Sequence, residues 1–370
     1  MEHRPRFAGL ILTLGGALLA FSCGTAPSAR ALVELGGGAR LEFATVDDGI
    51  RGLTTRDRFV AALSPFDRAA RRKTDGSVTE EEFLAFVAEQ VLPWEDAEID
   101  KLASVARGVV EKVRPLQLSL PARIRLVKTS GDEEGHAAYC RGNHIVLPQN
   151  VVERPAAKLE RLLLHELFHI FSRNQPRIRR ELYGIVGFEP CPEIELPESI
   201  RPRKLTNPDA PGCDVRIRLE VEGETVDAVP ILYSSEDRYD VGRGGEFFDY
   251  LIFRLLVVER NGDVWSAQLV DGAPRLLGTE NLPSFWERVG RNTNYVIHPE
   301  EILADNFVLL ATGAEDLATP RVVREMRSVL ERFAADKNVE CRTRNVEVKR
   351  SEALAFLRRC ASSSRSPVER

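Results

Sequence analysis

Several features are scarce or missing in this chain of 370 residues, and each absence excludes a class of protein. Beyond the N-terminus, no apolar run is long enough for a membrane-spanning helix. The formal net charge of −5 gives no electrostatic case for binding nucleic acid. The six cysteines include no Cys-x-x-Cys pair, so a zinc site built from cysteines is not expected. No internal repeat is present, which argues against a repeat architecture.

What remains is the composition of a globular protein. Hydrophobic residues make up 43% of the chain and charged residues 29%, and both fractions are ordinary for a soluble fold. A chain of this length can form one large domain or two modest ones with a substantial core.

The N-terminus has the features of an export signal. Basic residues precede an apolar stretch at residues 7–21, and small residues follow it. Residues 20–23, Ala-Phe-Ser-Cys, resemble a bacterial lipobox, which predicts lipidation of Cys23. Ordinary cleavage near Ala31 and an uncleaved anchor are the alternatives. We therefore expect an exported protein, either a membrane-anchored lipoprotein or a periplasmic or secreted one, which touches the membrane only through this end.

Five further cysteines are available for disulfides in an oxidising compartment. Two short-loop pairings are plausible, Cys191 with Cys213 and Cys341 with Cys360, and they would leave Cys140 free. Because spacing does not determine connectivity, both bridges are hypotheses.

The most informative stretch is residues 155–173, PAAKLERLLLHELFHIFSR. It predicts a single buried helix, because Pro155 suits the first helical position and apolar side chains surround the centre.

This helix carries a candidate metal site. His165 and His169 are four residues apart, hence on one face, where two neutral imidazoles can bind the same Zn²⁺. Glu166 points to the neighbouring side, where it can reach a metal-bound water without acting as a ligand. A chance occurrence of this pattern would bury two unpaired imidazoles and a carboxylate at a high cost, which a metal in a solvent-filled cleft would relieve.

A catalytic zinc centre needs a third protein ligand and a position left for water. The metzincin continuation of the motif fails, because Ser172 and Gln175 stand where Gly and His are required. That leaves a carboxylate, and Glu181 on the segment that follows is one candidate.

The better candidate lies in a second helix that begins at Pro299. Glu301 and Asp305 are four residues apart and share a face of this helix. We expect Glu301 to ligate zinc and Asp305 to accept a hydrogen bond from the free ring nitrogen of a ligand histidine. Glu300 fits an ordinary acidic helix start.

With the motifs His165-Glu166-x-x-His169 and Glu301-x-x-x-Asp305, the chain resembles a gluzincin, the metallopeptidase group of thermolysin and neprilysin. The resemblance covers the two helices and the strand before the first. It implies one Zn²⁺ held by the two histidines and Glu301, and a peptide or protein as substrate. It also implies that Glu166, as general base, takes a proton from a zinc-activated water and delivers it to the leaving amine.

This mechanism calls for a second donor to the oxyanion. Tyr295 and His298 stand just upstream of Glu301 and are the nearest candidates, while Tyr183 and Tyr250 are weaker ones.

The expected fold class is α+β. The resemblance implies a zincin-like metallopeptidase fold, with an N-terminal helical region and an antiparallel β insertion between the two metal-binding helices. Period-two alternation places that insertion at about residues 214–277. A strand at 138–147 would enter the first helix, as in zincins, where an edge strand pairs with an extended substrate.

The domain boundaries follow from these patterns. We expect a signal and the start of a tether at 1–31, a linker and helices at 32–115, and the catalytic domain at 116–318. A C-terminal helical segment at 319–360 and a disordered tail at 361–370 complete the chain.

Two classes of function compete. The leading hypothesis is an exported zinc metallopeptidase, and the alternative is a non-catalytic, envelope-associated binding protein on a zincin scaffold. The presence of Glu166 argues against the alternative, because a binding protein has no need of that carboxylate. A purely structural zinc is disfavoured, since three N and O ligands beside Glu166 suit an open site.

Overall fold

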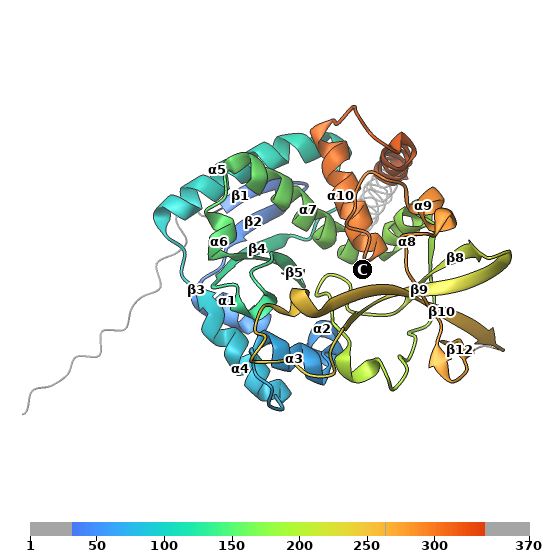
Figure 1. Ribbon diagram of the computed structural model, residues 1–370. Helices are drawn as coiled ribbons and strands as arrows, with labels where there is room; N and C mark the ends of the chain where they lie inside the picture. Colours follow the sequence, from blue (N-terminus) through green and yellow to red (C-terminus); the bar gives the residue numbers. More distant parts are fainter. Residues whose placement is uncertain (1–31, 263, 337–370) are drawn as a thin grey trace, which may run out of the picture.

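Two β-sheets and the helices packed against them form the part of the chain that the computed structural model describes, residues 32–262 and 264–336 (Figure 1). The fold is mixed α+β, as the sequence predicted. The predicted signal at 1–31, the tail at 361–370 and part of the predicted C-terminal helical segment lie outside these residues. The described portion of that segment, residues 320–336, is helical.

The first sheet has a parallel centre. Its path runs β1 (Leu32–Gly36), β2 (Ala39–Phe43), β4 (Arg123–Thr129), β6 (His144–Pro148) and β5 (Tyr139–Arg141), and β3 (Val91–Leu92) pairs with the end of β4. The pairs β2–β4 and β4–β6 are parallel, whereas β1 and β5 run antiparallel to their neighbours. The strand β5 therefore forms one edge of the sheet, next to the first metal-site helix.

Strands β1 and β2 correct the predicted linker. Residues 32–43 form a hairpin whose turn contains three successive glycines with positive φ, and β2 pairs with β4 in the middle of the sheet. In sequence, two short strands with small residues between them resemble a tether. Their place in the sheet is not visible locally, because the partner strand β4 lies about 80 positions further on. Strands from both sides of the predicted domain boundary at residue 115 belong to this one sheet, so the sheet is not divided there.

Helices cover both faces of the first sheet, so its parallel strands are buried on both sides. On one face lie α1 (Val46–Leu53), α2 (Arg58–Ala62), α3 (Pro65–Arg71) and α4 (Glu80–Gln90). On the other lie α5 (Asp96–Val113) and α7 (Ala156–Asn174), with α6 (Gln149–Val152) leading into α7. The helices expected within residues 32–115 are confirmed by α1 to α5.

The second sheet is the predicted antiparallel insertion. Its path is β11 (Val264–Ala267), β10 (Leu251–Asn261), β9 (Glu224–Ser234), β8 (Val215–Val221) and β7 (Phe188–Pro190), with β14 (Leu276–Leu277) on β10. Beside it, β12 (Leu269–Val270) and β13 (Ala273–Pro274) form a two-stranded ribbon. The pairs β8–β9 and β9–β10 are antiparallel, so the expected meander at about 214–277 is confirmed.

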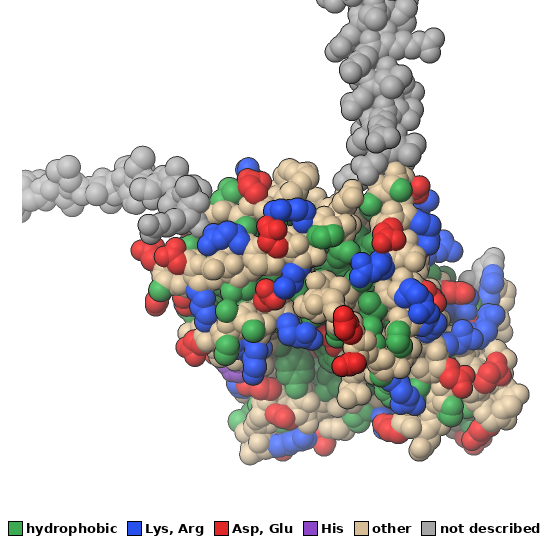
Figure 2. Space-filling view, turned by 90° about the horizontal axis from the view of Figure 1, so that it is seen from above, with side chains coloured by type: hydrophobic (Ala, Val, Ile, Leu, Met, Phe, Trp, Pro, Cys, Tyr) green, Lys and Arg blue, Asp and Glu red, His purple; other side chains and the backbone are tan. Residues whose placement is uncertain are grey.

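Helix α8 (Pro176–Ile185) connects α7 to the second sheet, and the chain returns from that sheet through α9 (Pro283–Val289) and α10 (Pro299–Thr312). Figure 1 shows α10 beside α7, and the rings of Phe168 and Phe307 pack between them with centroids 5.5 Å apart. Among the described residues, no helix combines the length and the apolar character that crossing a membrane requires. On the face drawn in Figure 2, acidic and basic side chains are interspersed.

Candidate metal centre

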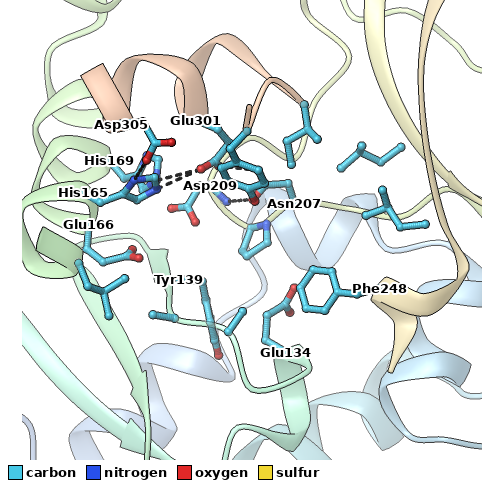
Figure 3. A pocket seen from close by; sticks show the side chains of 18 of the residues that line it. Glu134, Tyr139, His165, Glu166, His169, Asn207, Asp209, Phe248, Glu301 and Asp305 are labelled. Atoms are coloured by element: carbon cyan, nitrogen blue, oxygen red, sulfur yellow. Dashed lines mark hydrogen bonds and ion pairs between the residues drawn. The ribbon is translucent and has the colours of Figure 1, made fainter. Parts of the chain in front are cut away.

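Helices α7 and α10 bring His165, His169 and Glu301 together (Figure 3). One oxygen of Glu301, Oε2, lies 3.1 Å from Nε2 of His165 and 3.5 Å from Nε2 of His169. The two imidazole rings are nearly perpendicular, with an interplanar angle of 82°. His169 and Glu301 are buried and His165 is partly exposed, so the group lies at the wall of a cleft.

These spacings fit a zinc ion. Ligands at the usual Zn–N and Zn–O distances around a tetrahedral ion are about 3.3 Å from one another. The two distances from Glu301 bracket that value. Two imidazole nitrogens and one carboxylate oxygen are also a donor set that open zinc sites use. The residues present therefore fit the metal that the sequence predicted.

Each histidine is held by a carboxylate on its other ring nitrogen. Nδ1 of His165 lies 3.1 Å from Oδ1 of Asp305, and Nδ1 of His169 lies 3.2 Å from Oε1 of Glu300. If each Nδ1 carries the proton and donates it, Nε2 keeps its lone pair and faces the site. The contact between Asp305 and His165 is the one expected of a carboxylate behind a candidate ligand histidine.

The interpretation of Glu300 as an ordinary acidic helix start was wrong. Glu300 is buried, and it accepts hydrogen bonds from Ser172 Oγ at 2.9 Å and from the hydroxyl of Tyr183, while Arg179 pairs with it at 3.3 Å. Burial opposes its negative charge, but Arg179 and His169 outweigh that effect and lower the pKa of Glu300 to about 2. Its partners come from α7 and α8, so spacing within α10 gave no signal of them.

The charge state of the histidines is set by these carboxylates. Burial disfavours the imidazolium of His165, but hydrogen bonds to Asp305 and Glu301 outweigh burial and raise its pKa to about 9. The pKa of His169 is raised as well, although burial again acts in the opposite direction. A metal ion must displace protons from this site, so its affinity increases with pH.

Glu166 lies beside the donor group rather than within it (Figure 3). It lines the same cleft, and the thiol of Cys140 donates a hydrogen bond to its Oε2 at 3.2 Å. Burial, and next the negative charge of Asp209, raise the pKa of Glu166 to about 7. A carboxyl with this pKa can take up and release a proton near neutral pH.

Two residues that sequence reasoning missed come from the loop before β8. Asn207 donates from Nδ2 to Oε1 of Glu301 at 2.7 Å, which leaves Oε2 of Glu301 directed at the histidines. Asp209 accepts the backbone N–H of Cys140 and a hydrogen bond from Arg173 at 3.3 Å. Burial raises its pKa. Sequence reasoning missed both residues because nothing in this loop indicates which distant groups its side chains meet.

Cys140, Glu166 and Asp209 form a second buried group of metal-type ligands. Burial, with the negative charges of Glu166 and Asp209, raises the pKa of the Cys140 thiol well above its usual value. The thiol is therefore a neutral hydrogen-bond donor here rather than a thiolate ligand.

The cleft in front of the donor group has a volume of about 440 Å³. Tyr295 lines it and is 44% exposed, and partial burial together with the charge of Glu301 raises its pKa, so its phenol stays protonated and can donate. His298 does not line this cleft: its Nδ1 accepts the backbone N–H of Glu300 at 3.1 Å, and burial lowers its pKa to about 4. The helix-capping position of His298 does not support the predicted contact with substrate.

The other candidate residues from the sequence do not line the cleft. Tyr183 is bonded to Glu300 behind His169, and Tyr250 donates to the carbonyl of Gly244, so neither reaches the cleft. Glu181 pairs with Arg332 at 3.1 Å on the surface and is not the third ligand.

The predicted disulfide between Cys191 and Cys213 is not formed, since both residues are free thiols that pack in one apolar cluster. Cys23, Cys341 and Cys360 lie outside the described residues.

No protein-family model, curated protein or solved structure matches this chain. The structure shows a buried His–His–Glu group that could bind a metal, placed in a mixed α+β fold. Any narrower assignment is an inference from this geometry.

Proposed function

We propose that this chain is an exported, zinc-dependent metallopeptidase of the gluzincin type. One observation carries the proposal: the Nε2 atoms of two histidines and one oxygen of Glu301 converge at the wall of a cleft that Glu166 also lines. A binding protein on the same scaffold would gain nothing from burying Glu166, because burial of that carboxyl is unfavourable.

The arrangement of the first sheet supports a zincin-like fold. An antiparallel edge strand, β5, lies beside the helix that carries the two histidines. However, the outward backbone groups of Cys140 are already bonded to Asp209 and Arg173. An extended substrate is therefore left with the segment just before β5, at Ala138, because Ala137 already donates its backbone N–H to the carbonyl of Glu134 at 3.1 Å.

In the proposed reaction, each residue of the site would have a separate role. When bound, zinc polarises the scissile carbonyl and lowers the pKa of a water ligand. Glu166 accepts a proton at its carboxylate and passes it to the leaving amine. Asp305 and Glu300 keep the protons on Nδ1 of the histidines. The hydroxyl of Tyr295 donates a hydrogen bond to the developing oxyanion.

Export and lipidation at Cys23 are part of the proposal and rest on the N-terminal sequence alone. They are tested by mass spectrometry of the mature N-terminus, where an unmodified Cys23 would remove the lipid anchor from it.

The catalytic proposal is tested by separating metal binding from proton transfer. Purified wild-type protein is expected to hold about one zinc per chain and to cleave peptides in a chelator-sensitive way. Glu301→Ala should lose zinc, whereas Glu166→Gln should keep it and lose cleavage. Glu160→Gln serves as the matched control, because Glu160 lies on α7 but does not line the cleft.

Two results would contradict the proposal. Zinc content that is equal in wild type and Glu301→Ala would remove the ligand assignment. Cleavage that survives Glu166→Gln would remove the role of Glu166 as base, whatever the metal content.

A further inference from the structure

One wall of the cleft carries three basic side chains that have no role in the chemistry proposed above. Arg154 follows α6, and Lys158 and Arg161 lie in the first half of α7. All three are exposed and line the same cleft as His165 and Glu166.

These three side chains differ from other basic side chains near the site in having no partner in the described part of the chain. Within the described residues, none of the three makes an ion pair or a side-chain hydrogen bond. By contrast, Arg141 pairs with Asp57 at 3.0 Å, and Arg179 pairs with Glu300 at 3.3 Å. The charges of the cluster are therefore free to meet a ligand.

The position of the cluster relative to the metal group follows from helix geometry. Lys158, Arg161 and His165 are spaced by three and four residues, so they lie on one face of α7. With a rise of about 1.5 Å per residue, Arg161 lies roughly 6 Å and Lys158 roughly 10 Å along the axis from His165. Since an extended peptide advances about 3.3 Å per residue, these distances correspond to roughly two to three substrate residues.

The remainder of the cleft does not compete for an anion. Four of its five carboxylates contact a cationic or amide group of the protein: Glu301 contacts Asn207 and the histidines, Asp305 contacts His165, Asp209 contacts Arg173, and Glu134 contacts Arg71. The fifth, Glu166, is buried and accepts a hydrogen bond from the thiol of Cys140. A bound zinc would neutralise further negative charge at the deep end. Among the described residues that line the cleft, the exposed charges without a partner are therefore those of the basic cluster.

We propose that Arg154, Lys158 and Arg161 form an anion-binding subsite. This subsite selects peptides that carry a carboxylate about two to three residues from the cleaved bond. This specificity rests on the proposed peptidase function. The carboxylate has two possible sources, an Asp or Glu side chain or the free C-terminus of the substrate, and the two predict different cleavage patterns.

The test starts from one peptide that the wild-type protein cleaves. Glu or Gln is placed in turn at each of three positions on either side of the cleaved bond, and every peptide is made with a free and with an amidated C-terminus. The ratio of kcat/KM for Glu over Gln is measured for wild type and for the double variant Lys158→Gln/Arg161→Gln. Arg107→Gln is the control, because Arg107 is exposed on α5 and does not line the cleft.

We expect a Glu preference of roughly fivefold or more in wild type and in Arg107→Gln, which falls towards one in the double variant and in 1 M salt. A preference that persists with the amidated C-terminus assigns the carboxylate to a side chain. A preference for the free over the amidated C-terminus that is the same for the Glu and Gln peptides assigns it to the chain end. Equal rates for all the peptides, or a preference unchanged in the double variant, would overturn the subsite.

A binding measurement separates this proposal from the catalytic one. Zinc-loaded Glu166→Gln is titrated with the fluorescently labelled Glu and Gln peptides, and binding is followed by anisotropy. Suppose that wild-type protein cleaves no peptide, and that the Glu peptide still binds more tightly than the Gln peptide in a salt-dependent way. The peptidase proposal then fails, while the anion-binding subsite stands. An affinity that depends neither on Glu in place of Gln nor on a free C-terminus would overturn the subsite even if cleavage occurs.

Discussion

Two buried clusters of charge lie close together in this molecule, and they are neutralised in different ways. In the first, Arg71 is fully buried and pairs with Asp67 at 2.6 Å and Glu134 at 2.7 Å. In the second, Glu301, Glu300 and Asp305 surround two imidazoles that are neutral when they ligate a metal. The first cluster has a cation supplied by the chain itself. In the second, Arg179 pairs with Glu300, but Oε2 of Glu301 faces the two imidazoles, whose protons a metal ion could replace. The first cluster is therefore structural, and the second is a candidate for chemistry.

The two clusters are joined by a short loop. Arg71 donates to the carbonyl of Thr206 at 3.0 Å, and the hydroxyl of Thr206 donates to Asp67. The next residue, Asn207, holds Oε1 of Glu301. The position of the third candidate ligand therefore depends on the buried arginine.

Removing the internal cation should have the largest effect. Arg71→Met leaves Asp67 and Glu134 buried without their partner, and we expect a loss of about 3–5 kcal/mol in the free energy of unfolding. Urea denaturation measures it, with Arg107→Met expected within about 0.5 kcal/mol of wild type because that side chain is exposed. Zinc affinity should fall too, through the loop at Asn207. A change below 1 kcal/mol would mean that the first cluster is not held by its arginine.

The pH dependence should distinguish the clusters. The folded-state pKa of His165, about 9, lies above the ordinary value. Its stabilising effect on metal-free protein is therefore complete below pH 6.5 and is lost as the pH rises through 9. Between pH 7.5 and 9.5 we expect metal-free protein to lose about 2 kcal/mol of unfolding free energy from this group. Glu134, whose pKa burial raises to about 7 against the effect of Arg71, is already mostly ionised at the start of this window.

Zinc should abolish that pH dependence, because metal-bound imidazoles carry no proton on the ligating nitrogen. Parallel urea titrations of zinc-loaded and metal-free protein provide the measurement. A slope that is the same with and without zinc would show that the histidines do not hold the metal.

The smallest effect should come from the carboxylates behind the histidines. Asp305→Asn and Glu300→Gln keep the shape of each side chain but remove the charge that orients Nδ1, and we expect a roughly 10- to 100-fold loss of zinc affinity for each. Competition with a chromophoric chelator measures the loss. Glu300→Gln should be the more harmful, since it also leaves Arg179 without its buried partner. Unchanged affinity in both variants would make these carboxylates incidental to the metal site.

Local spacing explains how much of the site the sequence predicted. His165, Glu166 and His169 are placed by the period of one helix, and Glu301 and Asp305 by the period of another, so their shared faces follow from the chain. The antiparallel insertion could be predicted in the same way, because the alternation of buried and exposed side chains in β8 and β9 is local. The residues that were missed or misread have distant partners: β2 pairs with β4, Glu300 meets Arg179, and Asp209 meets Cys140.

By itself, the sequence determined which residues can be metal ligands and which helix faces carry them, because side-chain chemistry and helical periodicity are properties of short segments. Only the tertiary structure decided that the two helices pack side by side and that Asn207 and Glu300 hold the ligands in place. The same is true of the free charges of Lys158 and Arg161 at the cleft. The physical reason is that burial and pairing depend on which distant segments meet, and no local pattern encodes that meeting.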